Sequence, residues 1–323
     1  MPRPLDRRAL LLSAGPLLAG AAGCTAASRT SSEPSASASP HAPASASPHA
    51  SLPATTAWRP NRDDVDPDVK LRAVQVVEAI GAWPAGQGGA DAAKRRLAAL
   101  GAAPSLLDRA GPMRPAAPEA ALQVIEAQYG GILADRASVM VAYRQWTPGH
   151  DGGTTVEVLL DRARPRWDVT GLRPGRPGPA AAHIPPTARQ VLDHARIGLP
   201  PAAAADIRSG HIRPAALHTL LELAGTYRID VTVFSSGHPL YVFGTDRLSD
   251  HPPGRAFDVW RIDGHPVVDR ATSRRLIESF MRDAAAAGSY NVGGPLRPSG
   301  GATPNQFFTD DTHHDHVHVG FAG

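Results

Sequence analysis

Apolar residues recur every three or four positions along residues 69–83, which predicts an amphipathic helix. The residues that carry this spacing are Leu71, Val74, Val77 and Ile80. A second helix is predicted over 90–100, and a third over 118–129, where Gly130 and Gly131 would end it.

The hydrophobic period then changes from that of a helix to that of a strand. Residues 137–146, 154–160 and 166–170 alternate between apolar and polar and are rich in β-branched side chains. This pattern predicts a meander of antiparallel strands. Helices followed by a small sheet make an α+β module over 61–175, in which no residue pattern points to chemistry.

A segment rich in proline and glycine, 172–186, predicts a hinge between two folded regions. Beyond it, helices are predicted over 187–197, 214–227 and 272–287, and strands over 229–234, 256–262 and 316–321. The expected fold class is therefore α+β. A C-terminal domain over 176–323, with a small antiparallel sheet flanked by helices, follows the smaller α+β module.

The first residues have the pattern of an export signal. Arg3, Arg7 and Arg8 precede an apolar run that is too short to span a bilayer as a helix, which takes about 20 residues. This predicts a cleaved signal peptide over 1–23, and the arginine pair leaves the choice between the Sec and Tat routes open. Cys24 directly follows small residues, as in a lipobox, which predicts that Cys24 is lipidated.

Residues 24–60 are dominated by serine, alanine and proline. Such a segment has too little apolar surface to form a core, so it is expected to be a disordered linker. Together with the lipidated Cys24 it predicts a protein exported to the cell envelope. We expect an anchor in the outer face of the cytoplasmic membrane.

Charge and cysteine content exclude some classes of partner and of metal site. The formal net charge is +3, and no basic stripe is interleaved with aromatic residues, so a nucleic-acid partner is not expected. Cys24 is the single cysteine, which excludes an intrachain disulfide and a thiolate metal cluster. Any metal site must therefore use histidines and carboxylates.

The first stretch with candidate chemistry runs from Ser249 to Asp258. His251 precedes a turn that Gly254 permits, because glycine adopts backbone angles that other residues avoid. The chain then enters a strand at Ala256, and Asp258 lies on the same face of that strand as Ala256. A turn followed by a strand can bring the histidine and the carboxylate to one point.

The second stretch is the histidine-rich segment that ends in the last predicted strand. There His316 and His318 share one face, while Val317 and Val319 face a core. Two imidazoles and one carboxylate, with a fourth position left for water, are typical of catalytic zinc. A nearby group must then move the proton from water to the leaving amine.

The pattern S-x-H-x-x-G-x-A-x-D, followed downstream by H-x-H, resembles the LAS peptidases. These comprise lysostaphin-like endopeptidases, D-Ala-D-Ala metallopeptidases and the Hedgehog N-domain, and the similarity is greatest to peptidase family M15. The resemblance covers about residues 206–321. It implies that His251, Asp258 and His318 are ligands of Zn²⁺.

The resemblance leaves two candidates for the catalytic base. Asp315 stands three residues before the last ligand, where M15 enzymes usually have glutamate, and His316 is the first histidine of H-x-H. Both are predicted to be catalytic, and His313 could stabilise the oxyanion. Family members often carry Ser-Gly-Tyr-Arg after the first strand, whereas this chain has Ser236–Pro239 there. Arg247 and Ser249 are therefore the candidates for substrate binding.

These observations predict a zinc metallopeptidase that hydrolyses stem or cross-bridge peptides of peptidoglycan outside the cytoplasmic membrane. The alternative is a non-catalytic, zinc-containing lipoprotein that binds the cell wall or a partner. A third hypothesis is a lipoprotein that scavenges metal ions. Neither the bond that is cut nor the oligomeric state follows from the sequence.

Overall fold

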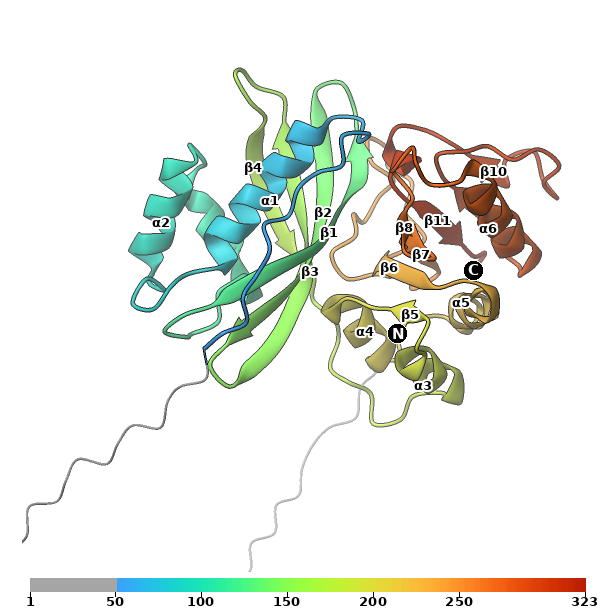
Figure 1. Ribbon diagram of the computed structural model, residues 1–323, viewed down its shortest axis with the longest axis horizontal. Coiled ribbons are helices and arrows are strands. Elements are labelled where there is room, and N and C mark those ends of the chain that lie inside the picture. Colours follow the sequence, from blue (N-terminus) through green and yellow to red (C-terminus); the bar gives the residue numbers. More distant parts are fainter. Residues whose placement is uncertain (1–50) are drawn as a thin grey trace, which may run out of the picture. The chain divides into compact units, whose positions relative to one another are not determined.

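Two β-sheets, each with its own apolar core, organise residues 51–323, the part of the chain that the computed structural model describes (Figure 1). The expected signal peptide 1–23, Cys24 and most of the expected linker lie outside the described residues. Residues 51–60 have no helix or strand, but Thr56 exchanges two hydrogen bonds with Gln123 and Trp58 packs against a core.

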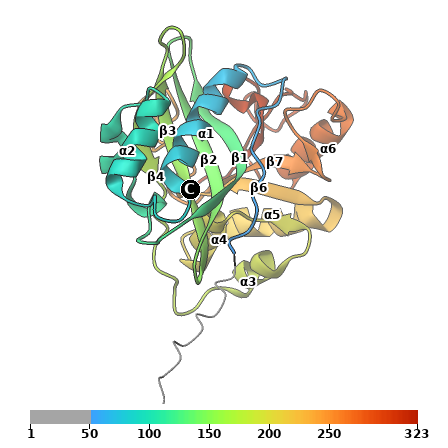
Figure 2. The same ribbon diagram turned by 60° about the vertical axis from the view of Figure 1, so that its left-hand side comes forward.

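The first sheet is an antiparallel meander in the order β1-β2-β3-β4. Its strands are β1 (Ala121–Ile132), β2 (Arg136–Thr147), β3 (His150–Asp161) and β4 (Asp168–Pro174). Helix α1 (Pro67–Gly81) crosses one face of this sheet (Figures 1 and 2). Helix α2 (Ala90–Ala99) packs beside α1, and two short 3₁₀ helices follow, η1 (Pro104–Arg109) and η2 (Gly111–Met113).

The third predicted helix, over 118–129, is wrong: this segment begins strand β1. Leu122 and Val124 alternate toward the core and pair with β2, so pairing along the whole strand overrides the local helix propensity. Gly130 and Gly131 lie inside the strand instead of ending a helix. A Cβ atom on Gly131 would lie 2.1 Å from the Phe243 side chain, so glycine permits a close approach between segments.

The second sheet is mixed, in the order β10-β9-β11-β7-β6-β5, with β8 paired to β7. Its strands are β5 (Ile197–Gly198), β6 (Ile229–Val233), β7 (Ala256–Ile262), β8 (His265–Pro266), β9 (Asn291–Gly293), β10 (Phe307–Phe308) and β11 (Val317–Gly320). The pairs β5/β6 and β9/β10 are parallel and the other pairs are antiparallel. The chain is thus a mixed α+β protein, as predicted, although this sheet is not purely antiparallel.

Four helices accompany the second sheet within the described residues: α3 (Pro186–Asp193), α4 (Pro201–Arg208), α5 (Pro214–Thr226) and α6 (Arg274–Ala286). The helix predicted over 187–197 is shorter than expected, because Ile197 already belongs to β5. Helix α4 was not predicted, and its alanine-rich sequence offers little periodicity. None of the helices in residues 51–323 is both long and apolar enough to span a membrane.

The free edge of β1 faces the last part of the chain. The backbone N–H of Tyr129 donates to Asp315 Oδ2, and that of Ile132 donates to Thr312 Oγ1 in the 3₁₀ helix η3 (Thr312–His314). Residues 51–323 belong to one compact unit. Strand β1 of the first sheet therefore contacts the histidine-rich segment directly.

Candidate metal centre

A glycine turn delivers His251 to the start of β7. Gly254 has φ +73°, a left-handed conformation, and a Cβ atom there would lie 2.4 Å from the carbonyl oxygen of His211. The N–H of Gly254 donates to the His251 carbonyl, which closes the turn. Strand β7 then begins at Ala256, as predicted, and places Asp258 two residues further on.

The pairing of β11 with β7 brings the two halves of the motif together. His318 is directly opposite Asp258 in the antiparallel register, and directly opposite residues share one face of a sheet. Val317 and Val319, on the other face, are fully buried in the core, as expected from the sequence. The register thus explains why residues 60 positions apart in the chain meet.

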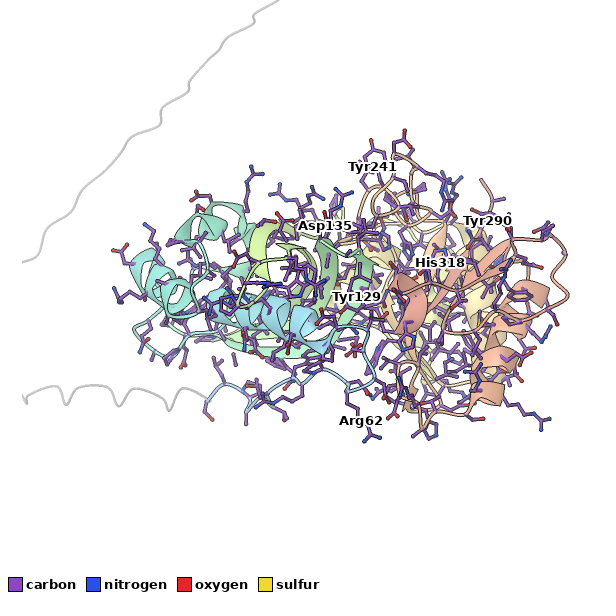
Figure 3. All side chains as sticks on the ribbon, turned by 90° about the horizontal axis from the view of Figure 1, so that it is seen from above. Arg62, Tyr129, Asp135, Tyr241, Tyr290 and His318 are labelled. Atoms are coloured by element: carbon purple, nitrogen blue, oxygen red, sulfur yellow. The ribbon has the colours of Figure 1, made fainter. Side chains whose placement is uncertain are left out.

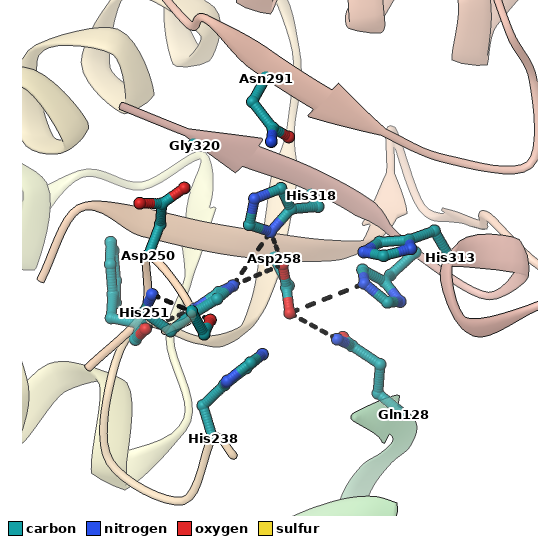
Figure 4. A network of polar contacts seen from close by, with 12 residues as sticks. Gln128, His238, Asp250, His251, Asp258, Asn291, His313, His318 and Gly320 are labelled. Atoms are coloured by element: carbon teal, nitrogen blue, oxygen red, sulfur yellow. Dashed lines mark hydrogen bonds and ion pairs between the residues drawn. The ribbon is translucent and has the colours of Figure 1, made fainter. Parts of the chain in front are cut away.

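Three atoms, from His251, Asp258 and His318, form a nearly equilateral triangle (Figure 4). His251 Nε2 lies 3.1 Å from Asp258 Oδ1 and 3.0 Å from His318 Nδ1. His318 Nδ1 lies 3.0 Å from the same carboxylate oxygen. In a tetrahedral zinc site with bonds of about 2.0–2.1 Å, any two ligand atoms are roughly 3.3 Å apart. The separations are therefore compatible with three ligands of one metal ion.

The protonation of these side chains also suits a metal. His251 Nδ1 lies 2.5 Å from the carbonyl oxygen of Phe234, which can only accept, so Nδ1 donates this bond and Nε2 is the nitrogen that faces Asp258. Burial lowers the pKa of His318 to about 4, against the opposite effect of Asp258, so its imidazole is neutral at pH 7. Burial opposes ionisation of Asp258, but His251 and His316 keep its pKa well below the ordinary value.

His238, which the sequence did not single out, also belongs to this cluster. His238, His251 and Asp258 each place one ligand atom within 4.8 Å of the others. The His238 and His251 rings are stacked, with centroids 3.8 Å apart and planes 9° from parallel. Because an imidazole lone pair lies in the ring plane, both rings cannot point at one ion. His238 thus lies beside the triangle, and His318 completes it.

The two candidates for the base occupy different environments. Asp315 Oδ1 lies 2.6 Å from His316 Nδ1, and Asp315 Oδ2 accepts from Lys70 Nζ at 2.6 Å and from the Tyr129 N–H at 2.9 Å. Burial opposes ionisation of Asp315, but Lys70 lowers its pKa to about 2. His316 Nε2 lies 3.7 Å from Asp258 Oδ2, and His316 lines the neighbouring cavity. Burial opposes protonation of His316, but Asp258 and Asp315 raise its pKa above the ordinary value.

A cavity of about 430 Å³ adjoins the triangle. His313 lines it with Nδ1 2.7 Å from Asp310 Oδ1, and its ring is edge-on to Phe308. Ser249 also lines the cavity, where its hydroxyl accepts from the His251 N–H, and Arg247 is exposed at its wall. All the candidate site residues in the described chain line this cavity except Asp315, which is buried against His316 and Lys70.

Two further residues of this region come from the first sheet and its helix, and the sequence did not reveal them. Gln128 of β1 donates from Nε2 to Asp258 Oδ2 at 2.7 Å (Figure 4). Lys70 of α1 is buried against Asp64 and Asp315. A signal did exist for Lys70, since it is spaced like an apolar residue with Val74 and Val77 on the buried face of the helix. Gln128 was hidden because its segment was assigned to a helix.

Comparisons with models of known protein families, with curated proteins and with solved structures found no match.

Proposed function

We propose that the chain is a zinc-dependent peptidase, with His251, Asp258 and His318 as the metal ligands. The observation that carries this proposal is the triangle of Nε2, Oδ1 and Nδ1 atoms with sides of 3.0–3.1 Å next to a cavity. The hydrogen bond from His251 Nδ1 to a backbone carbonyl supports it, because it leaves Nε2 as the nitrogen that can bind a cation. The pairing of β7 with β11 also supports it, because it places His318 opposite Asp258. An LAS-like, M15-like identity of residues 176–323 stays a proposal that rests on the sequence motif.

When bound, zinc in such a site supplies Lewis acidity that polarises a peptide carbonyl and acidifies a water molecule. The chain itself must then move the proton. His316 is the proposed base, because Asp315 fixes its Nδ1 and its Nε2 is beside Asp258 at the cavity. Asp315 is the proposed orienting group, because both of its oxygens are already engaged.

The remaining histidines suit substrate contacts. Burial, with His251 next in effect, lowers the pKa of His238 well below the ordinary value, so it offers a neutral imidazole beside the triangle. His313, paired with Asp310, is placed to stabilise negative charge on the substrate carbonyl. Arg247 is exposed at the cavity and suits a substrate carboxylate, while Ser249 positions the His251 backbone.

The proposed substrates are stem or cross-bridge peptides of peptidoglycan. A cavity of about 430 Å³ is within the range of small-ligand sites and accommodates a short peptide segment. The proposal that Cys24 is lipidated, at the end of an exported leader, would place the enzyme in the cell envelope beside that substrate. The proposed substrate class thus depends on the site, and the proposed location depends on the N-terminal sequence.

The test is incubation of the purified full chain with muropeptides, with added zinc and with a chelator, followed by mass spectrometry. We expect chelator-sensitive hydrolysis of one peptide bond. The control variant His265→Ala, which removes an exposed histidine of β8, should cleave like the wild type. Zinc binding without cleavage of any stem or cross-bridge peptide would favour the non-catalytic alternative and overturn the peptidase.

A further inference from the structure

Gln128 connects the first sheet to the proposed metal ligand Asp258. Its side chain is buried, its Nε2 donates to Asp258 Oδ2 at 2.7 Å, and its Oε1 is buried without a hydrogen-bond partner. A buried amide with one unsatisfied atom is an unfavourable way to fill space. The hydrogen bond to Asp258 is the feature that an apolar side chain of the same size would not supply.

Lys70 contacts Asp315, the residue that orients the proposed base His316. It is 1% exposed, and its ammonium group is paired with Asp315 and with Asp64. Together with the Tyr129 N–H, Lys70 occupies one oxygen of Asp315 and leaves the other for His316. Asp315 can therefore fix the His316 ring only in the orientation that Lys70 and β1 set.

We propose that Gln128 and Lys70 are positioning residues, and that α1 and β1 form part of the metal centre. This inference rests on the proposed function. Gln128 orients the ligand Asp258, and Lys70 orients Asp315 and through it His316. In Figure 3, Tyr129 of the first sheet and His318 of the second lie at the junction between the two groups of elements. Helix α1 and strand β1 then belong to the site as well as to the first sheet and its core.

The two residues predict separable effects. A group that orients a ligand typically changes metal affinity by about 10- to 100-fold when removed. A group that orients a proton-transfer residue changes turnover, since such transfer typically contributes about 10²–10⁴-fold. A merely structural role would move neither quantity selectively.

The first arm of the test measures zinc affinity by competition with a chromogenic chelator, together with the visible spectrum of the Co²⁺-substituted protein. Gln128→Leu should bind zinc about 10- to 100-fold more weakly and shift the Co²⁺ bands. Gln145→Leu is the matched control: Gln145 is buried in β2 and donates to Gly81 and Met113, away from the triangle. It should keep wild-type affinity and spectrum.

The second arm compares Lys70→Met with Arg72→Met, which removes another buried cation of α1 that bonds to carbonyls of Trp167, Leu100 and Gly101. Lys70→Met should lower kcat by roughly 10²-fold while zinc affinity stays within about twofold of wild type. Arg72→Met should keep both values. If Lys70→Met does not fold, the Gln128 arm decides alone.

The outcomes separate the two proposals. Wild-type zinc affinity and an unchanged Co²⁺ spectrum in Gln128→Leu would overturn the positioning role and leave the peptidase intact. An unchanged kcat in a folded Lys70→Met would overturn the Lys70 half. A wild-type chain that binds no zinc would overturn the proposed function first, and the positioning role with it.

Discussion

Two buried polar clusters lie side by side in this protein, and they differ in where their positive charge comes from. Around Lys70, the carboxylates of Asp64 and Asp315 contact an ammonium group that the chain itself supplies. Around Asp258, the neighbouring groups are His251 and His318, which offer ring nitrogens at 3.0–3.1 Å. In the first cluster one ammonium group is shared by two carboxylates, whereas the second has a donor set that is compatible with a metal ion.

This difference indicates how the chain can keep many ionisable groups at full burial. A buried charge is costly unless it is paired, and removing one partner of a buried pair typically costs about 3–5 kcal/mol. Asp315 joins the two clusters, because its oxygens contact Lys70 on one side and His316 on the other. The two clusters should therefore respond differently to mutation and to metal removal.

The largest effect should come from a mutation in the cluster around Asp258. His251→Ala removes one corner of the triangle, so zinc content should fall well below one ion per chain. Since Lewis acidity is worth several kcal/mol, kcat/KM on muropeptides should fall by about 10³-fold or more. Metal analysis of dialysed protein and steady-state kinetics measure this. Unchanged zinc would remove His251 as a ligand.

A smaller effect, confined to turnover, should follow from His316→Ala. Without the ring that Asp315 orients, kcat should fall by about 10²-fold while one zinc ion per chain is retained. His313→Ala should lower kcat less, because His313 does not contact Asp315 or Asp258 by a hydrogen bond. Loss of zinc from His316→Ala would instead make His316 a ligand and close the fourth position.

The smallest effect concerns stability in acid. The folded-state pKa of Asp315, about 2, is below its ordinary value of 3.8, so its ionised form stabilises the fold above about pH 4. That contribution, about 2 kcal/mol, is lost as pH falls from about 4 to 2. Burial raises the pKa of Glu126 from its ordinary value of 4.5 to about 8. Its effect on stability therefore has the opposite sign: it lowers the stability as the pH rises from about 4.5 to 8.

Urea unfolding of metal-free protein at several pH values tests this. The stability difference between wild type and Asp315→Asn should shrink as the pH falls below about 4. A difference that is independent of pH down to 3 would show that Asp315 is not held in its ionised form by Lys70.

Local patterns predicted the strands β6, β7 and β11 of the second sheet, which carry or adjoin the candidate ligands, but not the short strands β5, β8, β9 and β10. The glycine turn, the start of β7 at Ala256 and the buried Val317 and Val319 all follow from period-two alternation and turn chemistry. The prediction of a helix over 118–129 was wrong because its residues favour a helix in isolation, whereas pairing with β2 decides its structure. Long-range pairing of this kind leaves no mark on a short window of sequence.

The same limit explains which site residues were missed. Gln128 and Lys70 reach Asp258 and Asp315 across separations of 130 residues and more, through contacts between α1, β1 and the end of the chain. No spacing rule connects such positions. His238 was noted only as a departure from the family pattern, and its stacking on His251 depends on the path of the loop.

The central claim is tested most directly by anomalous diffraction at the zinc edge from crystals of the zinc-loaded full chain. We expect one peak within about 2.0–2.2 Å of His251 Nε2, Asp258 Oδ1 and His318 Nδ1. A peak bonded to His238 but not to His318, or none near these three atoms, would contradict it.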